Sequence, residues 1–224
     1  SPIHQGHRGL AEAAGKISGV EVGYELSVTN VDKPALAEAE VVPSKKLGQN
    51  FLTDPNTARW IVDQLQPEPG DFVVEVGPGT GALSEALAGR VRRLLLVEYD
   101  RRLAAWLKER FAGEDTVEVV HADGARFDLR PLFKERPVKF LGNLPYSAGG
   151  AILRNFLQRP SPVSRAVLML QKEVIDRILA VPRTKNYGVL ALRMQSEWFG
   201  NFSLTEVINL TSRFTIAQFL ARDD

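Results

Sequence analysis

The sequence predicts an α/β fold in which a mostly parallel sheet carries helices on both faces. Apolar runs of four or five residues, rich in β-branched side chains, alternate with segments whose apolar residues recur every three or four positions, as buried strands and amphipathic helices do. The first run ends in a glycine-rich turn, Gly77-Pro78-Gly79-Thr80-Gly81, directly ahead of such a helical segment. Strands that alternate with helices are joined by right-handed crossovers and lie parallel.

Composition and length place the chain among ordinary globular proteins. It has 224 residues, of which 44% are hydrophobic and 25% charged, and a net charge of +1; this length suits one large domain, or one domain with a small appendage. No apolar run approaches the roughly 20 residues that span a membrane, so we expect a cytoplasmic protein without membrane association. The absence of cysteine excludes disulfides and thiolate nucleophiles. His4 and His7 lack an acidic third ligand, so no metal site is expected.

Residues 1–43 are expected to form an N-terminal extension. Apolar residues alternate with others over residues 19–31, a pattern that fits a half-buried strand or a linker. Pro34 and Pro43 bracket a stretch long enough for little more than a turn or two of helix.

The first well-defined helix begins at Pro55. Asp54 supplies an N-cap and Pro55 a first-turn proline, and apolar residues then recur at helical spacing as far as Leu65. Gln49 and Asn50 lie just before this helix. Two amides in that position fit an ordinary solvated loop, and they also fit a lid over a bound ligand.

Five apolar runs are expected to form the strands of the sheet, and helical stripes follow four of them. The strand candidates are residues 72–76, 94–97, 117–120, 138–141 and 166–170. The helical stripes place their apolar residues between positions 83 and 87, 103 and 111, 152 and 157, and 174 and 179. Gly89 ends the first of these helices and Asp100 caps the second. Residues at the carboxyl ends of parallel strands share one edge of the sheet, where ligands bind.

The glycine turn and a following acid form the first candidate site. Gly77, Gly79 and Gly81 stand at every second position after the strand, where glycine tolerates positive φ and lets a ligand approach the backbone. Glu98 lies seventeen residues further on, at the end of the next strand, and is placed to accept hydrogen bonds from two ribose hydroxyls. The pattern fits binding of S-adenosylmethionine or of a dinucleotide, and a plain tight turn is the third interpretation.

The stretch Asn143-Leu144-Pro145-Tyr146 follows the fourth strand candidate. An asparagine with a proline two residues later can present its side-chain carbonyl and a backbone carbonyl toward one point, beside an aromatic ring. Two acceptors and a ring suit a flat base with an exocyclic amine. A turn with a packed tyrosine is the alternative, and Glu98 and Asp123 on the same edge favour the binding site.

Five motifs in order and spacing resemble the KsgA-type ribosomal RNA adenine dimethyltransferases, over roughly residues 44–195. The motifs are Lys46-Leu47-Gly48-Gln49-Asn50-Phe51-Leu52, Glu75-Val76-Gly77-Pro78-Gly79-Thr80-Gly81, Val97-Glu98-Tyr99-Asp100, Gly142-Asn143-Leu144-Pro145-Tyr146 and Leu170-Gln171-Lys172-Glu173-Val174. The related Erm enzymes, which modify large-subunit RNA, share the glycine turn and the Asn-x-Pro-Tyr motif. The last motif, followed by Pro182, Lys185 and Tyr187-Gly188, is more similar to KsgA.

The resemblance implies a Rossmann-like, S-adenosylmethionine-dependent methyltransferase fold and a role in ribosome biogenesis. The implied reaction transfers two methyl groups to the 6-amino group of each of two adjacent adenosines near the 3′ end of small-subunit ribosomal RNA. The implied partners are ribosomal RNA and the small ribosomal subunit, and we expect a monomer.

The resemblance also implies a role for each matched residue. Gln49, Asn50 and Leu52 would close over S-adenosylmethionine, and the three glycines would contact its methionine end. Glu98 would bind the ribose hydroxyls and Asp123 the adenine amine of the cofactor. The residues implied to act on the target base are Asn143, Leu144, Pro145 and Tyr146, with Asn143 also touching the cofactor.

The chain departs from the family beyond residue 195. Family members continue with a strand, a Phe-x-Pro-x-Pro-Lys loop and a small helical domain, and none of these is expected here. We predict a catalytic domain over residues 44–205 and a short C-terminal remnant over residues 206–224. The stretch Ser147-Ala148-Gly149-Gly150 also differs from the usual residues after the tyrosine.

These departures leave other functions open. One is a cofactor-binding RNA or ribosome-assembly module with weak or lost catalysis; another is an Erm-like methyltransferase of large-subunit RNA. A nicotinamide dehydrogenase is a third, without an evident third glycine or hydride-transfer partner. Clustered cations occur at Lys45-Lys46, Arg90 with Arg92-Arg93, and Arg101-Arg102, where solvated helix faces are an alternative to phosphate binding. We expect weak RNA binding with a shallow salt dependence.

Overall fold

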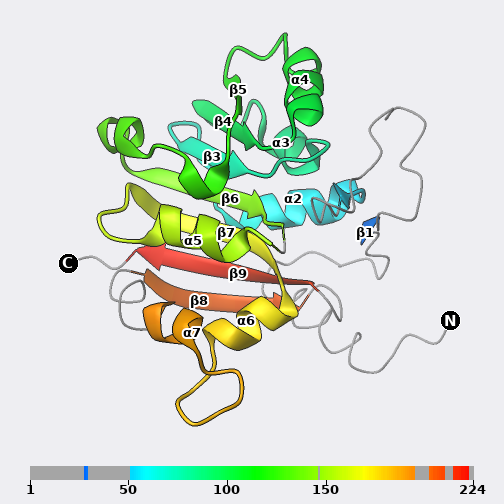
Figure 1. The fold of residues 1–224 in the computed structure, drawn as a ribbon. Coiled ribbons are helices and arrows are strands. Elements are labelled where there is room, and N and C mark those ends of the chain that lie inside the picture. The colour runs from blue at the N-terminus through cyan, green and yellow to red at the C-terminus, as the bar shows by residue number, and fades with distance from the viewer. Residues whose placement is uncertain (1–27, 30–50, 146, 195–201, 210–213, 222–224) are drawn as a thin grey trace, which may run out of the picture.

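The computed structural model describes residues 28–29, 51–145, 147–194, 202–209 and 214–221. Their centre is a seven-stranded sheet with the strand order β5-β4-β3-β6-β7-β9-β8 (Figure 1). The strands are β3 (Phe72–Val76), β4 (Arg93–Glu98), β5 (Val117–His121), β6 (Val138–Asn143), β7 (Val163–Gln171), β8 (Phe202–Asn209) and β9 (Phe214–Ala221). A separate antiparallel pair joins β1 (Val28–Thr29) to β2 (Phe51–Leu52).

The sheet is parallel from β5 to β7 and antiparallel at β9 and β8. Its five parallel strands are the five that the sequence predicts, each one to four residues longer or equal in length. The chain adds β4 and β5 on one side of β3 and then β6 and β7 on the other side. This reversal makes the β3–β6 boundary a topological switch point, where open α/β sheets bind ligands.

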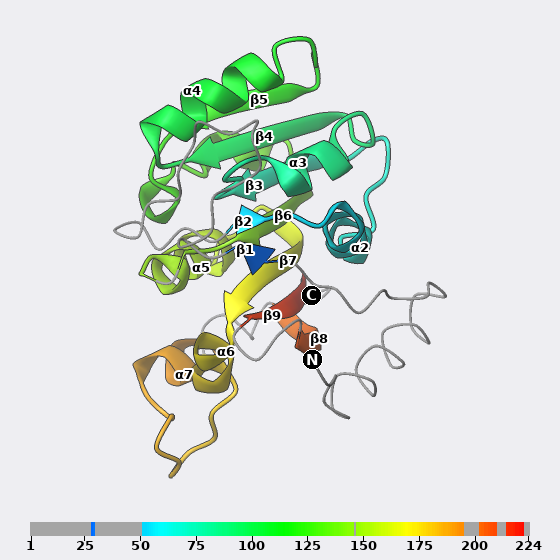
Figure 2. The same ribbon diagram turned by 90° about the vertical axis from the view of Figure 1, so that its right-hand side faces the viewer.

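Helices cover both faces of the sheet, as predicted; Figure 2 shows α2 and α5 on opposite sides. One face carries α2 (Pro55–Gln64), α3 (Ala82–Leu87) and α4 (Arg101–Arg110). The other face carries α5 (Gly149–Leu157), α6 (Lys172–Ile178), α7 (Val189–Arg193) and the 3-10 helices η2 (Gly124–Arg126) and η3 (Arg130–Lys134). Among the described residues, no helix is long and apolar enough to cross a membrane.

Local sequence signals determine where the predicted helices begin. The side chain of Asp54 accepts hydrogen bonds from the backbone N–H groups of Asn56, at 3.3 Å, and Thr57, at 2.9 Å, so α2 is capped as predicted. The side chain of Asp100 accepts from the N–H of Arg102 at 2.9 Å and caps α4 in the same way. These caps satisfy N–H groups that have no partner inside the helix.

The C-terminal strands correct the expectation that no strand follows residue 195. β9 pairs with β7 in seven registered positions, from Arg165 opposite Leu220 to Gln171 opposite Phe214. Polar residues inside β9 interrupt its apolar pattern, yet both Thr215 and Gln218 are buried. The side chain of Gln218 donates to that of Gln64 in α2 at 3.0 Å, so its burial is compensated. The boundary expected between residues 205 and 206 falls inside β8.

Smaller differences concern the ends of elements. Leu179, expected in the apolar stripe of a helix, is 44% exposed because α6 ends one residue earlier. The helices α7, η2 and η3 are only three to five residues long, too short for a periodic pattern to predict them. Of the N-terminal extension, the structure describes only β1, so the expectations for residues 1–27 and 30–43 lie outside the described residues.

Candidate active site

The carboxyl ends of four neighbouring strands meet at one edge of the sheet. Val76, the last residue of β3, lies opposite Val97 of β4 on one side and opposite Gly142 of β6 on the other. Glu98, which ends β4, lies opposite His121, which ends β5. The register therefore brings Glu98, the glycine turn and Asn143 together, as the sequence predicts.

The glycine turn depends on glycine at each of its three positions. Gly77, Gly79 and Gly81 all have positive φ, at 72°, 59° and 84°, a region that other residues rarely adopt. A Cβ atom on Gly77 would lie 3.0 Å from the backbone oxygen of Asn143. The N–H of Gly77 donates to the carbonyl of Val97 at 3.0 Å. The turn thus packs against both neighbouring strands, and its backbone is accessible to a ligand only because side chains are missing.

Glu98 holds the glycine turn from the neighbouring strand. Its Oε2 accepts a hydrogen bond from the N–H of Gly79 at 3.2 Å, and its Oε1 accepts from the N–H of Asp100 at 2.8 Å. The side chain is buried, with 4% relative exposure, and burial raises the pKa of Glu98 above its usual value while the two N–H donors lower it. A carboxylate has about four acceptor positions, so each oxygen retains capacity for a hydroxyl donor.

Asp123 lies two residues after β5 and caps η2. Its Oδ1 accepts from the N–H of Ala125 at 2.9 Å, and its side chain is 40% exposed. The following residue, Gly124, has no room for a side chain, because a Cβ atom would lie 2.5 Å from Cγ1 of Val76. This close packing fixes Asp123 beside the end of β3, within the same edge as Glu98.

The Asn143 segment turns sharply from β6 into α5. Leu144 is buried and its N–H donates to the carbonyl of Met169 in β7 at 3.2 Å. The carbonyl of Pro145 accepts from the N–H groups of Ala148, at 3.2 Å, and Gly149, at 2.9 Å. Asn143 is therefore held between β3 and β7 by its neighbours in sequence.

The remaining predicted site residues divide into two groups. Gln49, Asn50 and Tyr146 lie outside the described residues. The side chain of Leu52 is buried in the apolar cluster beneath α2 and α3. That packing accounts for Leu52 as a core residue, and its predicted contact with a ligand stays a prediction.

A buried acid, Glu75, is the site feature that the sequence-based list of candidate residues omits. It lies in β3 two residues before the turn with no exposed surface, and Ser84 of α3 donates to its Oε2 at 2.7 Å. Its Oε1 has no hydrogen-bond partner among the described residues. Burial raises the pKa of Glu75 to about 8, the hydrogen bond from Ser84 lowers it, and the charge of Glu98 raises it further. The sequence signal that could have identified Glu75 is an acidic residue within an otherwise apolar strand.

Comparison with known proteins assigns the family. The model of the protein family described as "Ribosomal RNA adenine dimethylase" matches residues 43–199 of this chain. The chain belongs to the ribosomal RNA adenine dimethylase family. The resemblance that the five motifs predict is thereby confirmed, and it covers the glycine turn, Glu98, Asp123 and Asn143.

Curated relatives of this chain are named "Ribosomal RNA small subunit methyltransferase A". The protein from Prosthecochloris aestuarii is 44% identical over 157 residues, which are 70% of this chain and 59% of the relative. The protein from Geobacter metallireducens is 46% identical over 155 residues, which are 67% of this chain and 56% of the relative. The matched part of the chain covers 53% to 61% of the length of these relatives.

Solved structures with this fold include methyltransferases. The 23S ribosomal RNA methyltransferase ErmE is 28% identical with a TM-score of 0.61, over 78% of this chain and 71% of ErmE. A dimethyladenosine transferase from Plasmodium falciparum has a TM-score of 0.63 over 77% of this chain and 63% of that protein. Its 23% identity supports the fold alone. The chain therefore has the fold of these methyltransferases, as its sequence predicts.

Proposed function

We propose that this chain transfers methyl groups from S-adenosylmethionine to the 6-amino groups of two adjacent adenosines near the 3′ end of small-subunit ribosomal RNA. The observation that carries the proposal is the meeting of Glu98, the glycine turn and Asn143 at the switch point of the sheet. The names of the relatives, which specify small-subunit ribosomal RNA, support the same substrate.

The proposed cofactor site uses the buried edge of β3, β4 and β5. Glu98 accepts hydrogen bonds from the two ribose hydroxyls, because its buried carboxylate is already fixed by two N–H donors. Asp123 accepts from the adenine amine, and the turn at Gly77 lies against the methionine end. Gln49, Asn50 and Leu52 close over the cofactor, as the family resemblance implies. Glycine is required at position 77, since a side chain there would meet the carbonyl of Asn143 and displace the turn.

Asn143 and Leu144 act on the target amine in this proposal. The lone pair of an adenine amine is delocalised into the ring, so acceptors for its two hydrogens are needed to localise the pair. The Asn143 side-chain oxygen and the Leu144 carbonyl supply them, and Tyr146 stacks on the base, worth about 1 to 3 kcal/mol. S-adenosylmethionine supplies an electrophilic methyl group. The amine nitrogen forms the new N–C bond, the methyl–sulfur bond breaks, and a proton leaves the nitrogen for water, so positioning replaces a strong base.

The test is a labelled-methyl assay on unmethylated small ribosomal subunits, with large-subunit RNA as a second substrate. We expect transfer to the small subunit, and loss of that transfer in Asn143→Ala with cofactor affinity retained. Cofactor binding without transfer to either RNA would favour a cofactor-binding assembly module. Transfer to large-subunit RNA alone would favour an Erm-like activity, for which the similarity to ErmE is the supporting observation.

We also propose that the protein works as a monomer in the cytoplasm. Its proposed substrate is a ribosomal subunit there. Light scattering of the purified chain with and without S-adenosylmethionine measures the oligomeric state, and a stable dimer would contradict this part of the proposal.

A further inference from the structure

Positive charge is concentrated in one part of the chain. Residues 147–194 contain eight basic and two acidic residues, a net +6, whereas the rest of the chain has 20 basic and 25 acidic residues, a net −5. One of the two acids, Asp176, already pairs with Lys172 at 2.8 Å. A single-signed region within an almost neutral protein generates a local field that attracts a polyanion.

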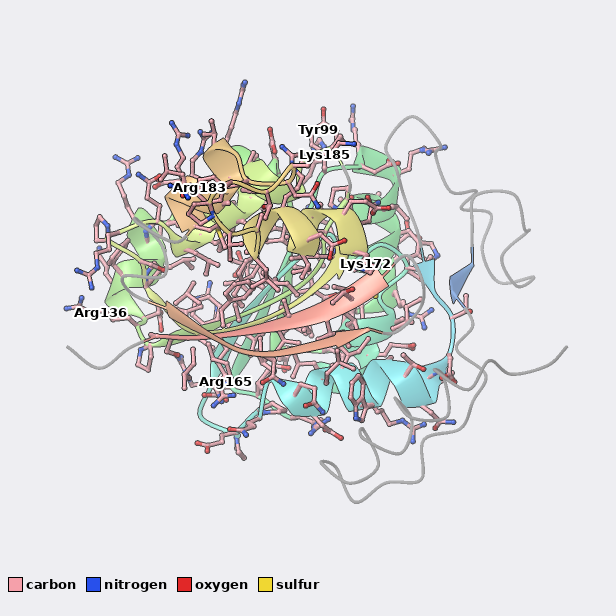
Figure 3. The ribbon with its side chains drawn as sticks, turned by 90° about the horizontal axis from the view of Figure 1, so that it is seen from below. Tyr99, Arg136, Arg165, Lys172, Arg183 and Lys185 are labelled. Carbon is pink, nitrogen blue, oxygen red and sulfur yellow. The ribbon has the colours of Figure 1, made fainter. Side chains whose placement is uncertain are left out.

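Five of these cations are exposed on α5, α6, α7 and the segment between the last two, a set that we call the α5–α7 face. Its members are Arg154 of α5, Arg177 of α6, Arg183 and Lys185 between α6 and α7, and Arg193 of α7. All five are exposed, and none pairs with an acid elsewhere in the part of the chain that the structure describes. Figure 3 shows Arg183 and Lys185 on the outer side of the segment that joins the two helices.

The cation clusters evident in the sequence behave differently. Arg90 pairs with Asp63 at 2.7 Å, Arg92 with Glu135 at 3.1 Å, and Arg102 with Asp100 at 3.1 Å. The charges of these three arginines are therefore paired with acids of the same chain. The five cations of the α5–α7 face, by contrast, have no acidic partner among the described residues.

A groove between α5 and α7 lies within this face. It is lined by Gly150, Ala151, Arg154, Val189, Leu190 and Arg193. Arg154 reaches the groove from α5 and Arg193 from α7. Val189, which also lines the groove, is more than half exposed. The groove begins at the first turn of α5, whose Gly149 N–H bonds to the carbonyl of Pro145 at 2.9 Å. It therefore starts next to the segment that bears Asn143.

We propose that the α5–α7 face docks the phosphodiester backbone of the RNA strand that carries the target adenosine, with Arg154 and Arg193 binding phosphates in the groove. Guanidinium groups bind phosphate oxygens in a bidentate manner. The cations are spread over three elements, so they suit the repeated phosphates of an RNA backbone better than a single acidic side chain of a protein partner. Exposed Val189 gives the sugars an apolar contact. The inference rests on the proposed function, because the site beside the groove is assigned there to an adenosine.

The test compares two double variants that remove the same charge. Arg154→Gln with Arg193→Gln alters the groove. Lys134→Gln with Arg136→Gln is the control, because both exposed residues precede β6 and so lie at the edge of the sheet opposite Asn143. The probe is a fluorescent RNA of the small-subunit 3′ end, titrated at several ionic strengths. We expect the groove variant to bind about tenfold more weakly or worse, and its slope of log K against log salt to fall by about 1.4 to 2. The control should match the wild type.

Further measurements separate misfolding and failure of the proposed function from failure of the inference. S-adenosylmethionine binding by calorimetry should be equal in all variants, which shows that the fold is kept. Arg183→Gln with Lys185→Gln provides a second, independent loss of RNA affinity. Equal RNA affinity and equal salt slopes for the groove variants and the control would overturn the proposal and assign the face to a different anionic partner. A groove-dependent loss of RNA binding without any methyl transfer would overturn the proposed function alone.

Discussion

Replacing Glu75 with glutamine should change how stability depends on pH. Glu75 is fully buried in β3 and accepts a hydrogen bond from Ser84. Glutamine has the same shape and an oxygen that can accept the same bond, but it does not titrate. The substitution therefore removes a proton-binding site while it keeps the packing of β3 against α3.

The sign follows from the raised pKa of Glu75, which is about 8 in the folded protein and about 4.5 without burial. Between these values the folded state keeps a proton that the unfolded state has lost. The free energy of unfolding should therefore fall as pH rises across this window, by about 1.4 kcal/mol per pH unit at most, and level off above it. Glu98, whose pKa is also raised by burial, adds a slope of the same sign. The difference between wild type and Glu75→Gln isolates the contribution of Glu75.

Urea unfolding from about pH 5 to about pH 8 measures this difference. Glu75→Gln should gain stability over the wild type progressively as pH rises. The control is Glu118→Gln, which removes an exposed acid that pairs with Arg93 and should shift stability by about 1 kcal/mol or less, with little dependence on pH. A gap between wild type and Glu75→Gln that stays constant across the range would refute the buried, protonated state of Glu75.

Three further substitutions test the candidate site. Glu98→Ala should weaken S-adenosylmethionine binding by about 1 to 3 kcal/mol, since charge-assisted hydrogen bonds are lost; equal affinity by calorimetry would remove Glu98 from the site. Asn143→Ala should lower turnover far more than cofactor affinity, because its partner is the reacting amine, and losses in proportion would contradict that role. Gly77→Ala should destabilise the fold by about 1 to 2 kcal/mol or more, because of its positive φ, and should weaken cofactor binding. Gly113→Ala, with open space around it, should do neither. Equal urea midpoints for the two variants would show that the turn is not constrained.

Short-range patterns predicted the parallel part of the fold well. Asp54 and Asp100 cap helices through bonds to residues two or three positions away, so their roles are legible in a short window of sequence. The meeting of Glu98 and Asn143 at one edge also followed, because carboxyl ends of parallel strands share an edge. The family relationship confirmed the fold that these patterns predicted.

Long-range pairing explains most of what the sequence did not reveal. The sequence of β9 mixes polar and apolar residues. Its partner strand β7 lies about fifty residues earlier in the chain, so no short stretch of sequence shows that the two strands pair. Arg93 looked like part of a phosphate-binding cluster, but it pairs with Glu118 at 2.7 Å and Glu135 at 3.5 Å. Conversely, Arg154 and Arg193 are far apart in sequence and share a groove only because α7 packs near α5.

The order of the strands separates the residues proposed to bind the cofactor from those proposed to bind the RNA. The residues proposed for the cofactor, Glu98 and Asp123, follow β4 and β5, on one side of β3. The residues proposed for the RNA follow β6 and β7, on the other side. Gly77 lies at the boundary, where even a methyl group would come within 3.0 Å of the Asn143 carbonyl. A methyl donor and an acceptor amine bound from opposite sides would thus meet beside the glycine turn, and such positioning is what a methyl transfer without a strong base requires.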